Sequence, residues 1–314
     1  MILKNGQVFT ALGRFLTADV ELEGDRIKQV APAGTLHGAE EIDAAGKYVT
    51  PGFVDIHIHG AAGADFCDSV DGSQEYVKTM QKYLGSQGVT SFMGTTMAFS
   101  EEILNDIFAA VKPLFNQEAQ GAVLRGVNME GPFFNKAKKG AQAEKYIIDP
   151  DWEMFQRLWQ TSGGNIRLVD VAPELPGAVE FIRKASELCT VSIAHTSATY
   201  EEAKAAYANG ASHTTHLFNA MPAFTHRAPG VVGAAADDAA HVEMISDGIH
   251  LHPAVVRAVF ALFGAERVCL ISDSMRACGM PNGEYSLGGQ KVFMNDGLAT
   301  PVSYTHLTLP TTSR

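Results

Sequence analysis

The sequence has few cysteines and no excess of positive charge. Its 314 residues include only four cysteines, and their spacing fits neither a zinc knuckle nor a disulfide framework, so we expect reduced thiols. Lys and Arg number 24 against 35 Asp and Glu, a net charge of −11. This balance argues against a nucleic-acid partner, because phosphates would be repelled over most of the surface. It leaves open an anionic small molecule, since a local cationic pocket can override a distant field.

Long apolar runs are missing too. The stretch from Val255 to Phe263 is interrupted by Arg257 and is too short to cross a bilayer. The first ten residues lack the basic region and apolar stretch of a signal peptide. We therefore expect a cytoplasmic protein that does not bind membranes. The hydrophobic content of 46% is sufficient for a large buried core.

Residues 1–50 predict a small all-β unit. Segments 1–10, 19–30 and 41–49 are short and β-prone, and Gly, Asp and Pro separate them. So few strands do not complete a domain. We therefore expect an incomplete β-sandwich that needs partner strands from elsewhere in the chain.

Residues 51–300 predict an α/β barrel. Eight strand-like runs lie at 53–60, 89–96, 124–131, 166–173, 190–197, 213–221, 241–249 and 268–275. Helical patterns separate them, most clearly at 73–87, 150–163 and 253–263. Near-continuous apolar strands that alternate with helices indicate parallel β/α units, and eight such units close a (β/α)₈ TIM barrel.

Residues of metal-ligand type lie at the ends of the predicted strands. His57 and His59 are two apart on the first strand, so both side chains point to one face, roughly 7 Å apart at Cα. Taken alone, the pair could be structural. Four further residues lie in or at the ends of other runs: Glu130, His195, His216 and Asp273. Imidazole and carboxylate ligands fit zinc, iron(II) or manganese. The sequence therefore predicts a divalent-metal site at the mouth of the barrel.

Several motifs resemble a known enzyme family. PGFVDIHIHG is similar to the first-strand signature of the amidohydrolase superfamily. MEGPFFNKAKKGAQ, HTTHLFNAMPAFTHRAPGVVG, SDGIH and ISDS, in that order, resemble the N-acetylglucosamine-6-phosphate deacetylases. The resemblance runs from Met1 to about Thr300. It implies deacetylation of N-acetyl-D-glucosamine 6-phosphate in amino-sugar catabolism, by metal-activated water, in a homodimer.

The resemblance also implies a role for each metal ligand. Glu130, His195 and His216 would hold the principal metal. His57 and His59 would hold a second ion, bridged by Glu130. One or two divalent ions are therefore expected, zinc first, with iron, manganese or cobalt as alternatives.

Asp273 would be the catalytic acid and base, and Asn219, Ala220, Arg227 and His250 would recognise the sugar phosphate. Gln142 stands where some family members carry a histidine that polarises the acetyl carbonyl. Its amide can donate a hydrogen bond to a developing oxyanion, but it adds no charge. We expect a second metal to supply the missing electrophile.

Three alternatives stay open at this point. Dihydroorotase-like or hydantoinase-like enzymes share the first-strand histidines, but many bridge their metals through a carboxylated lysine on the fourth strand, and 166–173 contains no lysine. A nucleobase deaminase would release ammonia instead of acetate. Residues 301–314 have no counterpart in the family and look like a non-native tail after a truncation, so an inactive fragment is the third alternative.

Overall fold

The computed structural model describes residues 1–295 and 297–301. Almost all of the predicted tail therefore lies outside the described residues. The chain divides into two compact units, Met1–Phe53 and Val54–Arg314. Each unit is described separately below.

The N-terminal unit is one small sheet. Its strands are β1 (Ile2–Phe9), β2 (Phe15–Glu23), β3 (Arg26–Pro32), β4 (Glu41–Asp43) and β5 (Tyr48–Val49), in the order β3-β2-β1-β4 with β5 also on β1. Val8, Ala18 and Val20 form its small core. Phe15 and Tyr48 stack edge to face but remain exposed. The described residues of this unit thus form a single sheet, without the second sheet of a complete sandwich.

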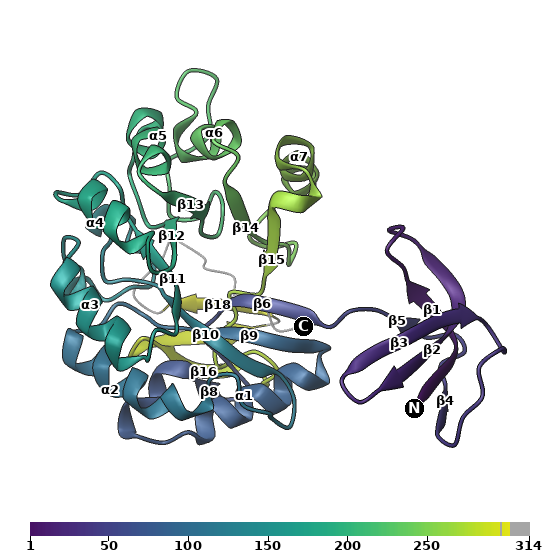
Figure 1. Ribbon diagram of the computed structural model, residues 1–314. Helices are drawn as coiled ribbons and strands as arrows, with labels where there is room; N and C mark the ends of the chain where they lie inside the picture. The colour runs from purple at the N-terminus through teal and green to yellow at the C-terminus, as the bar shows by residue number, and fades with distance from the viewer. Residues whose placement is uncertain (296, 302–314) are drawn as a thin grey trace. The chain divides into compact units, whose positions relative to one another are not determined.

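The larger unit is the predicted barrel. Its strands are β6 (Phe53–Ile58), β9 (Val89–Thr95), β10 (Val123–Met129), β11 (Ile166–Val171), β12 (Thr190–Ile193), β13 (Ala211–Thr214), β14 (His241–Ile245) and β15 (Val268–Ile271). They neighbour one another in chain order from β6 to β15 (Figure 1). The segment that follows the last strand meets the end of the first through backbone hydrogen bonds, from Asp273 to His57 and from His59 to Ser274, both 2.9 Å. The prediction of an eight-stranded α/β barrel is confirmed.

Helices surround these strands (Figure 1). They are α1 (Glu75–Ser86), α2 (Glu101–Val111), α3 (Trp152–Thr161), α4 (Ala178–Ala185), α5 (Tyr200–Ala208), α6 (Gly230–Asp237) and α7 (Pro253–Phe263). The three helical patterns read from the sequence are α1, α3 and α7. Asp151 caps α3 by accepting a hydrogen bond from the Met154 amide, and α7 ends at Gly264, whose φ is 72°.

Shorter elements connect them. These are the hairpin β7 (Gly60–Ala61) and β8 (Ala64–Asp65), and the 3₁₀ helices η1 (Phe66–Asp71), η2 (Lys112–Leu114), η3 (Lys136–Lys138), η4 (Glu144–Tyr146) and η5 (Ala265–Arg267).

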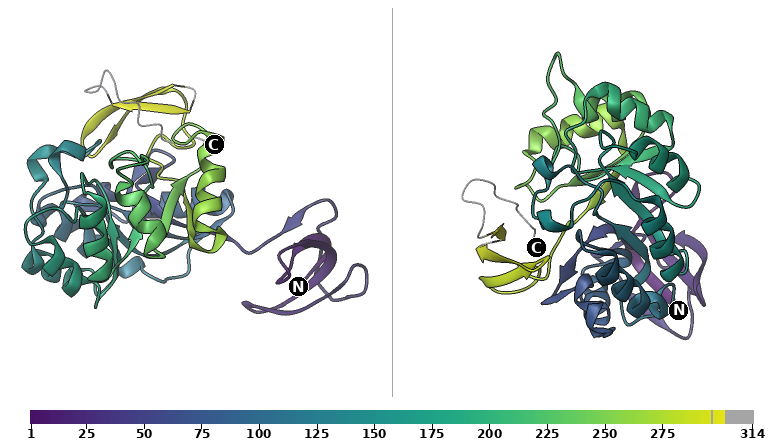
Figure 2. Two further views of the ribbon diagram at one scale, coloured as in Figure 1. Left: turned by 90° about the horizontal axis from the view of Figure 1, so that it is seen from above. Right: turned by 90° about the vertical axis from the view of Figure 1, so that its left-hand side faces the viewer.

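A second antiparallel sheet follows the barrel strands and was not predicted. It contains β16 (Gly283–Leu287), β17 (Gln290–Asn295) and β18 (Leu298–Pro301). Its buried side chains, Leu287, Val292, Met294 and Ala299, belong to the main core. Figure 2 shows this sheet lying along one side of the barrel. The Gln290 side chain donates a hydrogen bond to the Ala141 carbonyl, so the sheet contacts the loop after β10.

The sequence extended the sixth strand too far. It predicted a strand over 213–221, but β13 ends at Thr214 and a series of turns follows. His216, Phe218 and Ala220 have φ values of 29°, 76° and 52°, a conformation that breaks a strand. The polar residues read as strand ends therefore lie on the loops that follow the strands.

Candidate active site

Glu130 lies at the centre of four histidines. It follows β10, and its Oε1 is 3.1 Å from Nε2 of His195 and 3.3 Å from Nε2 of His216. The same oxygen is 3.6 Å from Nε2 of His57, and the second oxygen is 3.3 Å from Nε2 of His59. All five side chains are buried. The barrel thus brings together side chains from β6 and from the loops after β10, β12 and β13.

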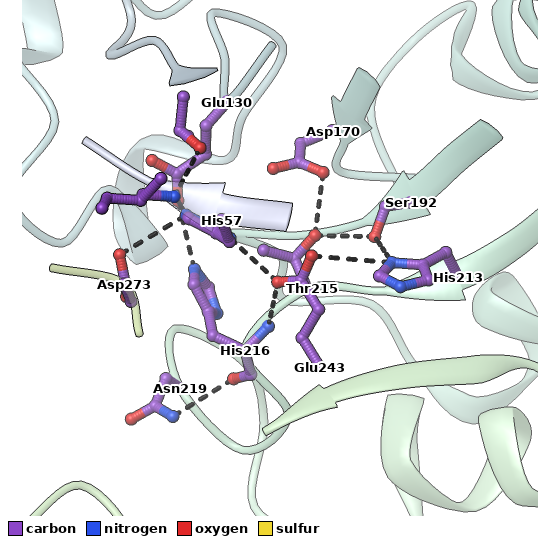
Figure 3. A network of polar contacts seen from close by, with 12 residues as sticks. His57, Glu130, Asp170, Ser192, His213, Thr215, His216, Asn219, Glu243 and Asp273 are labelled. Carbon is purple, nitrogen blue, oxygen red and sulfur yellow. Dashed lines mark hydrogen bonds and ion pairs between the residues drawn. The ribbon is translucent and has the colours of Figure 1, made fainter. Parts of the chain in front are cut away.

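The five residues form two overlapping triads. His57, His59 and Glu130 offer ligand atoms within 4.8 Å of one another, and so do Glu130, His195 and His216. Asp273 completes the ring, since its Oδ1 is 3.4 Å from Nε2 of both His57 and His59. Every residue predicted as a ligand or as the acid and base therefore belongs to one cluster. Figure 3 shows His57, Glu130, His216 and Asp273 in this cluster.

The orientation of the rings fits a cation between them. Nδ1–H of His195 donates to the Lys138 carbonyl at 2.8 Å, so Nε2 presents a lone pair. Nε2 of His216 lies 3.2 Å from that nitrogen, and two lone pairs at this distance need a proton or a cation between them. Nε2 of His57 is buried without a hydrogen-bond partner. This donor set suits a divalent metal of the zinc or iron class.

The electrostatics of these side chains point the same way. Burial by itself would lower the pKa of His57, but Glu243 and Asp273 raise that pKa well above its usual range. Burial opposes protonation of His59 too, yet Asp273 and Glu130 raise its pKa to about 9. Burial raises the pKa of Asp273, but the two histidines lower it to about 2. Protons on imidazoles thus supply the positive charge that a metal ion would bring.

The backbone around the site is strained. Nine non-glycine residues of the described chain have positive φ, and five of them are His195, His216, Phe218, Ala220 and Asp273. Such conformations cost of order 1–3 kcal/mol each and persist where the surroundings enforce them, commonly at functional sites.

A cavity of about 500 Å³ opens over the site. Four of the residues predicted to contact substrate line it: Gln142, Asn219, Ala220 and His250. Nδ1 of His250 is held by Asp247 at 2.7 Å. The cavity therefore joins the candidate metal ligands to a polar wall, as in a small-molecule binding site.

Comparison with known proteins places this site in a family. The amidohydrolase family model matches residues 48–283. The chain is 38% identical over 298 residues to N-acetylglucosamine-6-phosphate deacetylase of Lysinibacillus sphaericus, covering 94% of this chain and 76% of that protein. The chain belongs to the N-acetylglucosamine-6-phosphate deacetylase family of amidohydrolases.

Other members of this deacetylase family agree in sequence and in fold. The Bacillus subtilis enzyme is 37% identical over 297 residues, covering 93% of this chain and 72% of that protein. A mutant of the Mycobacterium smegmatis deacetylase, solved in complex with N-acetyl-D-glucosamine-6-phosphate, superposes with a TM-score of 0.91 at 30% identity. That comparison covers 100% of this chain and 80% of that structure.

Two predicted substrate contacts of the deacetylase family stand apart from the others. Arg227 is exposed and is not among the residues that line the cavity. Gln142 lines the cavity, but its amide is already engaged: Oε1 accepts from the Ala98 amide and Nε2 donates to Glu130, both at 2.7 Å. One N–H of the Gln142 side-chain amide thus orients the Glu130 carboxylate. The same amide nitrogen carries a second N–H.

Sequence reasoning missed two sets of residues at this deacetylase-family site. Lys136, Lys138 and Lys139 line the cavity, and the lysine-rich KAKKG segment was a signal that could have found them. Glu243 is fully buried inside β14, 2.8 Å from Nδ1 of His57. A carboxylate within an otherwise apolar barrel strand was its only sequence signal.

Proposed function

We propose that this protein hydrolyses N-acetyl-D-glucosamine 6-phosphate to D-glucosamine 6-phosphate and acetate. The observation that carries this proposal is the position of Glu130 between two histidine pairs, with Asp273 beside them, beneath a cavity in a chain of this family. The relatives named above are deacetylases of this sugar phosphate, which supports the choice of substrate.

The residues support a metal-assisted hydrolysis. A bound divalent metal would polarise the acetyl carbonyl and lower the pKa of a water molecule toward neutrality. Asp273 is ionised at neutral pH, because its pKa is about 2, so it can accept the proton of that water as the new C–O bond forms. It then returns the proton to the amide nitrogen as the C–N bond breaks, and the products are acetate and the free amine.

Residues on the cavity wall would position the substrate. We assign Asn219, Ala220 and His250 to the sugar phosphate, and Gln142 to the oxyanion through its second N–H. Lys138 and Lys139 lie on the same wall and add positive charge, which suits a phosphate group. Arg227 remains a proposed phosphate contact, and its exposed position requires its loop to close or a second copy of the chain to present it.

Finer points of the proposal concern the metal and the assembly. We propose zinc as the metal and two ions for the two triads. From the family resemblance we also propose a homodimer in the cytoplasm. Within the described residues, no helix is long and apolar enough to cross a membrane.

Acetate release tests the function. Purified protein would be stripped of metal, reloaded separately with zinc, iron(II), manganese or cobalt, and assayed on phosphorylated and unphosphorylated N-acetylglucosamine. We expect acetate and free amine in equal amounts, with phosphorylated substrate strongly preferred. Absence of acetate with all four metals would reject the proposal, and release of ammonia from nucleobases would favour a deaminase instead.

A further inference from the structure

Glu243 joins the two metal triads from behind. It lies on β14, is fully buried, and is not among the residues that line the cavity. Its Oε2 accepts a hydrogen bond from Nδ1 of His57 at 2.8 Å and another from the backbone amide of His216 at 3.1 Å (Figure 3). One carboxylate oxygen therefore binds a residue of each triad.

Each of these contacts has a consequence for the ligand it reaches. In the neutral imidazole that would bind a metal, donation by Nδ1 of His57 leaves the lone pair on Nε2, which faces Glu130 and Asp273. A carboxylate behind a ligating imidazole also fixes the ring and increases its basicity. His216 has a φ of 29°, and the bond to its amide holds that strained turn in place.

The contacts of Glu243 give no sign of a direct role with substrate. Its other oxygen, Oε1, has no hydrogen-bond partner among the described residues, and Nδ1 of His213 lies 3.9 Å from it. A buried carboxylate without a bound partner is costly, so its retention here needs a compensating interaction. His57 and the His216 turn supply it.

We propose that Glu243 is a positioning residue that fixes His57 and the His216 turn together, so that both triads face the bridging carboxylate of Glu130. This inference rests on the proposed metal-dependent function. It predicts that a substitution of Glu243 changes the affinity for the metal, although Glu243 does not line the cavity that would hold the substrate.

Asp170 offers a matched control. It is also a fully buried carboxyl group in the same polar network, where its Oδ1 accepts a hydrogen bond from Thr215 at 2.8 Å. In the part of the chain that the structure describes, it forms no hydrogen bond or ion pair with a member of either triad. Burial, together with Glu243 and Glu130, raises the pKa of Asp170 well above its usual range, so asparagine resembles its neutral form. Asp170→Asn therefore removes a buried acid without changing the ligands.

The test measures zinc affinity directly. Wild-type protein, Glu243→Ala, Glu243→Gln, Asp170→Asn and His57→Ala would be titrated with zinc against a competing chelator, with bound metal determined by mass spectrometry. We expect Glu243→Ala to weaken zinc binding at the His57 triad by about 10–100-fold. Glu243→Gln keeps an oxygen acceptor and should recover part of that loss, whereas Asp170→Asn should bind zinc as the wild type does.

Two results would overturn the inference while leaving the proposed function intact. The first is native zinc affinity in Glu243→Ala when His57→Ala has lost an ion. The second is an equal loss in Glu243→Ala and Asp170→Asn, which would indicate general damage to the core.

A further comparison applies if Glu243→Ala does not fold. Glu243→Gln must then bind zinc more weakly than Asp170→Asn, and equal zinc affinities in these two variants would refute the positioning role of Glu243. An unchanged zinc content in His57→Ala would instead reject the two-ion site itself, and Glu243 positioning with it.

Discussion

At the scale of single residues, the proposed metal ligands gather at one mouth of the barrel, and Glu243 contacts His57 and the His216 amide from behind them. His57, Glu130 and Asp273 stood out because polar residues at the ends of apolar strands are unusual, and the barrel brings all strand ends to one mouth. Glu243 did not stand out, because its importance depends on a 2.8 Å contact with a residue 186 positions away. Such contacts are set by the register of neighbouring strands, which the composition of one strand does not reveal.

Asp273 gives the sharpest prediction at this scale. Asp273→Asn should lower kcat by about 10²–10⁴-fold, because an amide cannot accept the proton of the attacking water or return it to the leaving amine. Since Asp273 lies 3.4 Å from both first-strand histidines, zinc content should be measured in parallel with acetate release. A variant with near-native turnover would remove Asp273 from this role.

The raised pKa of His59 predicts how the metal-free protein responds to pH. The pKa of His59 is about 9 in the folded protein and about 6.5 in the unfolded chain. Protonation of His59 therefore adds to the free energy of unfolding, and this contribution is fully present below pH 6.5. That contribution, on the order of 3 kcal/mol, is lost as pH rises from 6.5 to about 9. Urea unfolding of chelator-treated protein should show this decline. His59→Gln should flatten it, and an identical slope in the variant would contradict the assignment.

At the scale of elements, the eight barrel strands and three of the seven described α-helices were predictable, whereas loops were not. The apolar periodicity located all eight barrel strands and three helices, because burial on one or both faces leaves a clear pattern. The turns at His216 and Ala220 have positive φ. A positive φ leaves no apolar pattern in the sequence, so the prediction extended the strand through these two residues. The sheet β16–β18 escaped for another reason: its strands are only four to six residues long, and of β16 and β17 only β17 alternates buried and exposed residues.

The position of Lys138 in η3 predicts that its side chain contributes to substrate binding. The backbone carbonyl of Lys138 accepts a hydrogen bond from His195. The side chain of Lys138 lies on the cavity wall and donates to the Met221 carbonyl at 3.3 Å. Lys138→Met should raise KM for the phosphorylated substrate by about tenfold, because one charge-assisted hydrogen bond to the phosphate would be lost. The value of kcat should change little. The unphosphorylated sugar should be unaffected. Lys145→Met, which removes a lysine outside the cavity lining, is the control, and equal effects in both variants would argue against a specific contact.

Packing between η1 and β9 predicts a position where a single methyl group is not tolerated. A Cβ at Gly94 would lie 2.2 Å from the ring of Phe66, which is fully buried. Gly94→Ala should therefore lower the free energy of unfolding by about 1–3 kcal/mol. Gly283→Ala, whose new Cβ would meet Tyr285 at 3.7 Å, should be close to neutral. Denaturant unfolding of both variants measures the difference, and equal stabilities would show that Phe66 can move aside.

At the scale of the whole molecule, closing the barrel creates the site. The proposed ligands come from the first strand and from loops after the third, fifth and sixth, so no single part of the barrel would hold a metal alone. The segment after the eighth strand adds Asp273 and is joined to the first strand by backbone hydrogen bonds. A cation bound here therefore links segments that are far apart in the chain, and metal binding should be coupled to the stability of the barrel as a unit.

This coupling can be measured by removing the metal. An ion at about 1,000 times its Kd stabilises the folded state by about 4 kcal/mol, and each kcal/mol shifts Tm by roughly 2–4 °C in a unit of this size. Stripping the metal should therefore lower Tm by roughly 10 °C, and zinc should restore it. Because no ligand is expected from the N-terminal sheet, the shift should appear in the transition of the barrel. A Tm that does not respond to metal would mean that the two triads hold no ion in the folded protein, whatever the origin of any activity.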